Sequence, residues 1–325
     1  MKINKYSLIF SCVLLSQFFV SCDDENIDKT NAPIAYEAIG GYASSDDIAA
    51  TDLVSKFSFE NNLTDSKGSI NNIIGNNIGY SAGVKGIAYN GSSSQERYFT
   101  GTATTAVTGL NSFTVSFWMN TANTVDPAVA GQGKGAQGIF SIVRPTEFWG
   151  ALNVFMENPD SAFPNRIRLK INLENGRNGV AWGSWGPIVN IDNNINKWMH
   201  VVFSYDASKS VFSAYINGEL APNLGSFPYA PSAGVNGSTV FYADNPGSIN
   251  NSNNAPKYGN FQMTGTNGKV VFGTHPFETT PALNNVGQQD WATSYAGLLD
   301  EFRIYKSALA SSDVRFLYKL ESDGR

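Results

Sequence analysis

Residues 166–173 read RIRLKINL, and this stretch decides the fold class. Ile167, Leu169, Ile171 and Leu173 share one parity, whereas every residue between them is polar or charged. Side chains of a β-strand point alternately to opposite faces. The pattern therefore predicts a strand with one buried face and one solvated face.

The same period of two recurs along the chain from Leu53 onward. Val211–Ile216 runs directly into Asn217-Gly218, a pair preferred in type I′ turns because both positions need positive φ, so a hairpin is predicted there. Further predicted strands cover residues 113–119, 138–143, 152–156, 198–205, 269–272 and 298–305.

One helix is predicted, near the C-terminus. Ser311 or Ser312 is the expected N-cap, and Val314, Leu317 and Tyr318 lie on one helical face. Many short strands without alternating helices predict an all-β fold, an antiparallel two-sheet β-sandwich with one short C-terminal helix. Two long Gly-, Ala- or Asn-rich stretches, 121–137 and 228–262, interrupt this rhythm, and loops of such length are usually functional or disordered.

The N-terminus predicts export. Lys2 and Lys5 precede an apolar stretch over residues 6–20, which ends at the small-residue site before Cys22. This is the pattern of a signal peptide over residues 1–21. The stretch is shorter than the roughly 20 apolar residues of a transmembrane helix, and Ser and Gln interrupt it.

Residues 19–22, FVSC, resemble the lipobox of bacterial lipoproteins, in which the cysteine is acylated and becomes the new N-terminus. The acidic run Asp23–Glu25 resembles the surface-export signal of lipoproteins in the Bacteroides group. The resemblance implies a protein held at the cell surface by outer-membrane lipid through acylated Cys22. Residues 22–50 are then a polar tether, and residues 51–325 a single domain.

Composition excludes one class of partner. Removing Lys2 and Lys5 leaves 20 basic against 27 acidic residues, without a basic cluster, so nucleic acid and anionic membrane surfaces are unfavourable partners. Cys12 lies in the predicted signal peptide, and Cys22 is the predicted site of acylation. The domain is therefore expected to fold without a disulfide.

Four segments in order resemble laminin-G-like jelly-roll domains of the concanavalin A-like lectin/glucanase superfamily. They are residues 57–68, residues 113–118 (FTVSFW), the Trp198–Gly218 hairpin and residues 297–305 (GLLDEFRIY). The resemblance covers residues 53–320 and implies a jelly roll with one concave sheet and commonly a bound calcium ion. It leaves function open, because the superfamily contains lectins, glycanases, adhesion modules and structural domains.

Catalysis is not supported by the sequence. A glycanase on this fold needs two carboxylates on one strand face, as in an E-x-D-x-x-E run, and the chain has none. Asp300 and Glu301 are neighbours and are expected on opposite faces. His200 and His275 are far apart in sequence, and His200 is expected to be a hydrogen-bonded structural residue.

Asp300 is the candidate metal ligand. It shares parity with Phe302 and Ile304, so it is expected to point toward the core, where a lone carboxylate is costly. One interpretation is a structural calcium site with Asp65, the companion that the resemblance implies. The alternative is that Asp300 caps backbone N–H groups near the chain ends and that Asp65 makes a turn.

Tryptophans supply the candidate ligand site. Trp118 and Trp198 lie in predicted strands and are assigned to core packing. The remaining four tryptophans lie in Gly- or Pro-punctuated segments, where a partly exposed indole can stack on a sugar ring: Trp149, Trp182, Trp185 and Trp291. Arg144, Asn153 and Asn178 are candidate hydrogen-bonding partners, and the alternative is that these tryptophans cover the sandwich edge.

These observations favour a non-catalytic carbohydrate-binding lipoprotein that captures polysaccharide or oligosaccharide, with outer-membrane glycan-uptake proteins as partners. The alternative from another class is a protein-binding adhesion or scaffold module, and a diverged glycoside hydrolase is the third hypothesis. Exposed tryptophans in a groove would favour glycan, whereas a broad apolar patch would favour protein.

Overall fold

The computed structural model describes residues 37–126, 128–174, 176–177, 180–181, 187–222, 224–226, 237–241, 257–263 and 265–325. Within it, Ala38–Arg325 forms one compact unit, so the packed region begins thirteen residues before residue 51. Cys22, Asn178, Trp182 and Trp185 lie outside the described residues.

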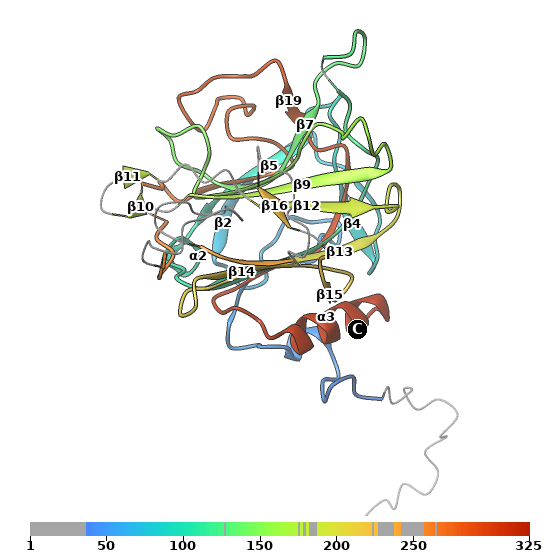
Figure 1. The fold of residues 1–325 in the computed structure, drawn as a ribbon, viewed down its shortest axis with the longest axis vertical. Coiled ribbons are helices and arrows are strands. Elements are labelled where there is room, and N and C mark those ends of the chain that lie inside the picture. The colour runs from blue at the N-terminus through green and yellow to red at the C-terminus, as the bar shows by residue number, and fades with distance from the viewer. Residues whose placement is uncertain are drawn as a thin grey trace, which may run out of the picture. The chain divides into compact units, whose positions relative to one another are not determined.

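The unit is a sandwich of two sheets, as the alternating strands predict (Figure 1). The first sheet runs, in spatial order, through β15 (Glu219–Leu220), β14 (Val211–Ile216), β13 (Met199–Asp206), β6 (Phe113–Thr121), β20 (Gly297–Tyr305), β4 (Ile87–Asn90) and β3 (Tyr80–Ala82). Two further strands, β1 (Leu53–Phe57) and β17 (Ser238–Val240), pair with β20 and β14.

The second sheet runs through β16 (Gly225–Ser226), β12 (Pro187–Asp192), β9 (Arg166–Leu173), β8 (Leu152–Met156), β7 (Ala136–Ile142), β18 (Lys269–Phe272), β5 (Tyr98–Ala103) and β2 (Ile70–Asn76). The short strand β19 (Ala292–Ser294) pairs in parallel with β7, whereas the other pairs in this sheet are antiparallel. Residues 176–177 (β10) and 180–181 (β11) form a separate two-stranded ribbon.

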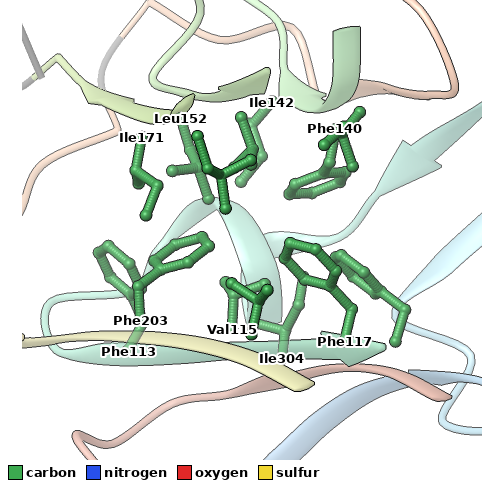
Figure 2. Packing of buried hydrophobic residues seen from close by; sticks show 14 of the residues in the cluster. Phe113, Val115, Phe117, Phe140, Ile142, Leu152, Ile171, Phe203 and Ile304 are labelled. Carbon is green, nitrogen blue, oxygen red and sulfur yellow. The ribbon is translucent and has the colours of Figure 1, made fainter. Parts of the chain in front are cut away.

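The core fills the space between the two sheets. Figure 2 shows side chains of the second sheet, such as Phe140 and Ile171, facing Phe113 and Phe203 of the first. Phe302 joins the layers, with ring centroids 4.9 Å from Phe140 and 4.8 Å from Phe272. Burying one Phe or Leu side chain contributes about 1.5–3 kcal/mol, so this cluster stabilises the fold without a crosslink.

The predicted hairpin and helix are both present. Asn217 (φ 52°) and Gly218 (φ 80°) connect β14 to β15, which confirms the turn. The helix α3 covers Ser311–Ser322, but its N-cap is Ala310, whose side chain cannot accept a capping hydrogen bond, so the predicted serine cap is wrong. The Ser311 hydroxyl lies instead 3.2 Å from that of Tyr215.

Helix α3 covers the outer face of the first sheet (Figure 1). Its Val314, Leu317 and Leu320 form a second apolar cluster with residues of the sheet and with Ile48, which follows the short 3-10 helix η1 (Ser45–Asp47). The remaining helix, α2 (Thr105–Thr108), is a single turn between β5 and β6.

Buried ion pairs fix this cover to the sheet. The fully buried guanidinium of Arg303 contacts Glu321 of α3 at 2.8 Å, Glu301 at 2.7 Å and Asp46 of η1 at 2.6 Å. Trp118 donates its indole N–H to Glu321 at 2.7 Å. Trp118 therefore packs under the helix rather than between the sheets.

Two other sequence-based assignments are settled by position. His200 is buried on the first sheet, 2.7 Å from the Ser116 hydroxyl, which confirms a structural role. Trp198 precedes β13 and is only half-buried, so its assignment to the core is wrong. Within the described part of the chain, no helix has the length and apolarity needed to cross a membrane.

Candidate functional site

The outer face of the second sheet carries most of the predicted ligand-binding residues that the structure describes. On β8, Leu152, Val154 and Met156 belong to the core, so Asn153 and Phe155 point to the opposite face. The loops that follow β7 and β18 lie over this face. Figure 1 shows the orange β18–β19 connection above the second sheet, on the side opposite α3.

Six rings from three segments form one aromatic cluster on this face. The members are Phe148 and Trp149 from the β7–β8 connection, Phe155 from β8, and His275, Phe277 and Trp291 from the β18–β19 connection. Trp149 stacks on Phe155 with centroids 5.0 Å apart and planes 7° apart. Phe148 stacks on Trp291 at 6.0 Å and 20°, and Trp149 lies 6.1 Å from Trp291.

Hydrogen bonds from one side chain hold the two connections together. The side-chain amide of Asn284 donates to the backbone carbonyl oxygens of Glu147 at 3.1 Å and Phe148 at 3.3 Å. Gly150 allows the chain to turn back after Trp149, because a Cβ at this position would lie 2.1 Å from the Ile142 carbonyl oxygen. The aromatic cluster is therefore set by main-chain packing and not only by ring contacts.

Three rings of the aromatic cluster are buried and three are partly exposed. Phe155, His275 and Phe277 are buried, whereas Phe148, Trp149 and Trp291 keep part of their surface in solvent. Burial lowers the pKa of His275 to about 3, so its ring is neutral at physiological pH. A partly exposed indole beside polar groups suits ligands with an apolar face and a polar edge.

Polar side chains lie next to the aromatic rings along the same strands. Ser141, Asn153 and Asn172 are cross-strand partners on β7, β8 and β9, and form a row that we call the polar row. Asn153 and Asn172 are fully buried, and among the described residues neither side-chain amide makes a hydrogen bond of good geometry. The Asn172 amide does act on the neighbouring Glu174 carboxyl, whose pKa it lowers. Most buried polar side chains in native proteins are hydrogen-bonded, so this row is unusual.

Arg144 and Glu174 continue the polar row at one end. Arg144 donates to the Glu174 carbonyl oxygen at 2.8 Å, and its guanidinium lies 3.5 Å from the Glu174 carboxylate. Both side chains are buried. Burial raises the pKa of Glu174 to about 8, although Arg144 acts in the opposite direction.

Lys170 places a cation against the aromatic rings. Its ammonium lies 5.4 Å from the ring centroid of Phe155 and 5.7 Å from that of Trp149, within cation–π range. The ammonium also pairs with Glu157 at 3.3 Å. The cation therefore lies beside the stacked pair of Trp149 and Phe155.

Four predicted ligand-binding residues are thus on or beside one face: Trp149, Trp291, Arg144 and Asn153. Five residues of this face were not predicted from the sequence as ligand-binding: Phe155, Lys170, Asn172, His275 and Phe277. A signal for three of them exists, because Phe155 shares the parity of Asn153, and Lys170 and Asn172 lie on the polar side of RIRLKINL. Nothing in the sequence indicates that the β18–β19 connection folds over β8.

The predicted metal ligands hold separate backbone turns. Asp65 accepts hydrogen bonds from the backbone N–H groups of Lys56, Lys67 and Ile70 at 2.8–2.9 Å. Asp300 accepts from Lys85 at 3.0 Å and from Glu301 at 2.9 Å, and burial raises its pKa to about 7. Both contacts match the backbone-capping alternative.

Asp300 does not follow the predicted parity. A bulge at Glu301, whose φ is 44°, shifts the register of β20, so Leu299 and Phe302 enter the core. Among the described residues no three His, Cys, Asp or Glu side chains gather as a metal site. Calcium stays a prediction, which thermal melts with and without EDTA would test.

Comparison with known proteins gives the family. The Laminin_G_3 family, described as the concanavalin A-like lectin/glucanases superfamily, matches residues 93–255. No curated protein matches the chain.

Solved structures similar to this chain include binding domains of botulinum neurotoxins. The serotype C1 binding domain has a TM-score of 0.49 at 15% identity, covering 83% of this chain and 52% of that one. The neurotoxin DC binding domain in complex with rat synaptotagmin II has a TM-score of 0.48 at 14% identity, with the same coverages. The chain spans about half the length of these solved chains.

The two-sheet antiparallel sandwich agrees with the family match, which covers half of the sequence. This chain belongs to the concanavalin A-like lectin/glucanases superfamily.

Proposed function

We propose that this protein is a surface-anchored, non-catalytic carbohydrate-binding protein that captures a glycan on the outer face of its second sheet. One observation carries the proposal. The half-exposed rings of Phe148, Trp149 and Trp291 converge beside a polar row whose Asn153 amide has no hydrogen-bond partner. A sugar ring needs both an apolar face and a set of hydrogen bonds, and this arrangement offers both.

The alternative of a protein-binding module finds less support. The exposed large apolar side chains among the described residues are Ile74, Val129, Phe163 and Leu220, which come from four separate segments. Single exposed apolar residues are normal on a soluble surface, whereas a protein-docking site needs a contiguous patch.

A diverged glycoside hydrolase is also less favoured. Two acidic side chains beside the aromatic cluster and the polar row are engaged by cations: Glu174 by Arg144 and Glu157 by Lys170. A hydrolase would need two carboxylates free to act on opposite sides of one glycosidic bond.

The anchor and the location belong to the same proposal. Acylation of Cys22 would hold the protein in the outer membrane with its sandwich at the cell surface, and captured polysaccharide would pass to outer-membrane uptake proteins. The support is the lipobox-like residues 19–22 and the acidic run after them. Metabolic labelling with a clickable fatty acid in wild type and Cys22→Ala would test the anchor.

Glycan-array binding by purified residues 23–325 tests the function. We expect a glycan signal that falls at least about tenfold, or 1.4 kcal/mol, in Trp149→Ala and in Trp291→Ala. Trp198→Ala is the matched control, because this half-buried indole lies at the first sheet. Absence of any glycan signal, or equal binding in all four proteins, would refute the function or its site.

The same array tests the two remaining predicted tryptophans, Trp182 and Trp185, as Trp182→Ala and Trp185→Ala. Both residues lie outside the described residues, so the sequence alone supports their inclusion. We expect weaker binding in both if their indoles stack on the same ligand.

A further inference from the structure

Four residues on the outer face of the second sheet carry six buried polar atoms that have no hydrogen-bond partner among the described residues. The two ring nitrogens of His275, in the aromatic cluster, are unpartnered as well. Three of the six atoms are donors: Nε of Arg144 and Nδ2 of Asn153 and Asn172. Two are acceptors, Oδ1 of Asn153 and Asn172, and the sixth is Oε2 of Glu174, which accepts a hydrogen bond when the carboxyl is ionised and can donate one when it is protonated. Exchanging the oxygen and nitrogen of either amide leaves this balance unchanged.

These four residues are contiguous, and we call them the polar group. Asn153 and Asn172 are direct cross-strand partners. Glu174 lies two residues beyond Asn172 and continues its face of the chain, and Arg144 reaches Glu174 from the end of β7. The exposed fraction is 0% for both asparagines, 2% for Arg144 and 4% for Glu174.

Leaving such atoms unpaired is costly. Each unsatisfied buried polar group costs about 1–3 kcal/mol, so six of them in one place would weigh heavily on a domain of ordinary stability. A bound molecule that supplies hydrogen bonds would remove this cost. Its chemistry follows from which bonds are missing.

The charge of the polar group is close to balanced. The Glu174 carboxylate is 3.5 Å from the Arg144 guanidinium, and burial raises the pKa of Glu174 to about 8, so this group is mostly protonated at neutral pH. Glu147, which is half-exposed on the same loop as Arg144, supplies the nearby negative charge that also acts on Arg144. Neither a strong cation site nor a strong anion site results.

We propose that the polar group binds a neutral sugar unit through adjacent hydroxyl groups, in preference to a uronate or a sulfate ester. This assignment rests on the proposed function and names its ligand class. A hydroxyl donates and accepts at once, so adjacent hydroxyls match side-chain amides, which offer both a donor and an acceptor. A carboxylate or sulfate group only accepts, and would leave the acceptors of Asn153 and Asn172 unpaired.

The distance to the aromatic cluster suits one sugar unit. Asn153 and Phe155 share a face two residues apart on β8, which places them about 7 Å apart at a rise of about 3.4 Å per residue. Trp149 stacks on Phe155. A sugar whose hydroxyl edge meets Asn153 therefore brings its ring close to the half-exposed Trp149.

The test compares glycans that differ in charge. Residues 23–325 are run in affinity gels containing galactan or polygalacturonate, and dextran or dextran sulfate, together with any array glycan and its sulfated or carboxylated counterpart. We expect the neutral member of a pair to bind and the charged member to bind at least about tenfold more weakly. Asn153→Ala and Asn172→Ala should each reduce neutral-glycan binding about tenfold, and exposed Asn71→Ala on β2 is the matched control.

The outcomes separate this inference from the proposed function. Stronger binding of the charged member, lost in Asn153→Ala, would overturn the neutral class and retain glycan binding. Unchanged glycan binding in both asparagine variants, with folding verified by circular dichroism, would mean that the polar group holds only water. No binding to any glycan would overturn the proposed function itself.

Discussion

Replacing Arg303 by methionine should remove much of the stability of the domain. The guanidinium is fully buried and contacts Glu301 and Glu321, whose side chains are 1% and 0% exposed, and the more exposed Asp46. The variant leaves the fully buried carboxylate of Glu321 without its ion-pair partner, whereas Glu301 keeps only the longer contact with Lys56 at 3.5 Å. Removing one member of a buried ion pair typically costs about 3–5 kcal/mol, and we expect a loss in this range at pH 7.5.

Urea denaturation measures this loss, and the chain offers a matched control. Arg315 of α3 pairs with Glu219 at 2.8 Å, but these side chains are 48% and 66% exposed. An exposed pair contributes about 0–1 kcal/mol, so Arg315→Met should shift the urea midpoint only slightly. The m-value should stay constant in both variants, since the surface exposed on unfolding is unchanged.

The effect of Arg303→Met should depend on pH. Burial raises the pKa of Glu321 to about 7 even beside Arg303. Without Arg303 the buried carboxyl of Glu321 takes up a proton more readily than in the unfolded chain, so lowering the pH raises the stability of the variant. The difference from wild type should fall to below about 2 kcal/mol at pH 5, where protonation of a carboxyl near its ordinary pKa costs little. A loss below 1 kcal/mol at pH 7.5, or a loss that grows in acid, would refute this account.

Three further predictions concern the core and the aromatic cluster. In wild type, burial lowers the pKa of His275 from 6.5 to about 3, so over that range the unfolded chain binds a proton that the folded chain does not, and stability falls as pH falls. As the pH is lowered from 6 to 4, the free energy of unfolding of His275→Phe should therefore rise relative to that of wild type by about 1.4 kcal/mol per pH unit in urea titrations. A difference that stays constant with pH would contradict a buried neutral imidazole. Gly150→Ala should displace Trp149, because the new Cβ would lie 2.1 Å from the Ile142 carbonyl oxygen, and a tryptophan fluorescence shift with loss of glycan binding would show it. Phe302→Ala should cost about 3–5 kcal/mol in the same urea assay, because the ring bridges both sheets, and a cost under 1 kcal/mol would mean that the site collapses without a cavity.

The sequence predicts the long strands well, and physical reasons explain where it fails. Strands with one core face and one polar face, such as RIRLKINL, carry a period of two that needs no tertiary information. Strand β2, with the sequence INNIIGN, lies at the edge of its sheet, and its pairing with β5 is irregular between Asn71 and Ile74. An edge strand with an irregular register does not alternate, so its pattern is absent from the sequence.

Parity fails at Asp300 for a related reason. Alternation assumes an unbroken strand, but the bulge at Glu301 adds one residue to β20 and moves Leu299 into the core. Glutamate gives no signal for a positive φ. Similarly, Ser311 is a good capping residue by type, but its hydroxyl lies next to Tyr215, a residue 96 positions away.

The site is predictable only in part. Gly-punctuated tryptophans indicate partial exposure one residue at a time, and Trp149 and Trp291 are indeed half-exposed. Their meeting depends on the β18–β19 connection, which Asn284 fixes to the β7–β8 connection. Likewise, the pairing of Asn153 with Asn172 is a matter of register between two strands, which composition does not reveal.

Two buried arginines in the same sandwich show why the second sheet, rather than the first, is the candidate ligand surface. Arg303 on the first sheet has every guanidinium nitrogen bonded, to Glu321, Asp46, Glu301 and Ser45. Arg144 on the second sheet has an unpaired Nε and a single carboxylate no closer than 3.5 Å. All hydrogen bonds of a buried guanidinium are therefore formed where α3 covers the outer face of the first sheet. The incomplete hydrogen bonding of Arg144 is a local property of the outer face of the second sheet. An unpaired buried donor is costly, so the unpaired Nε of Arg144 beside partly exposed tryptophans favours a face that binds a polar ligand over one that only covers the core.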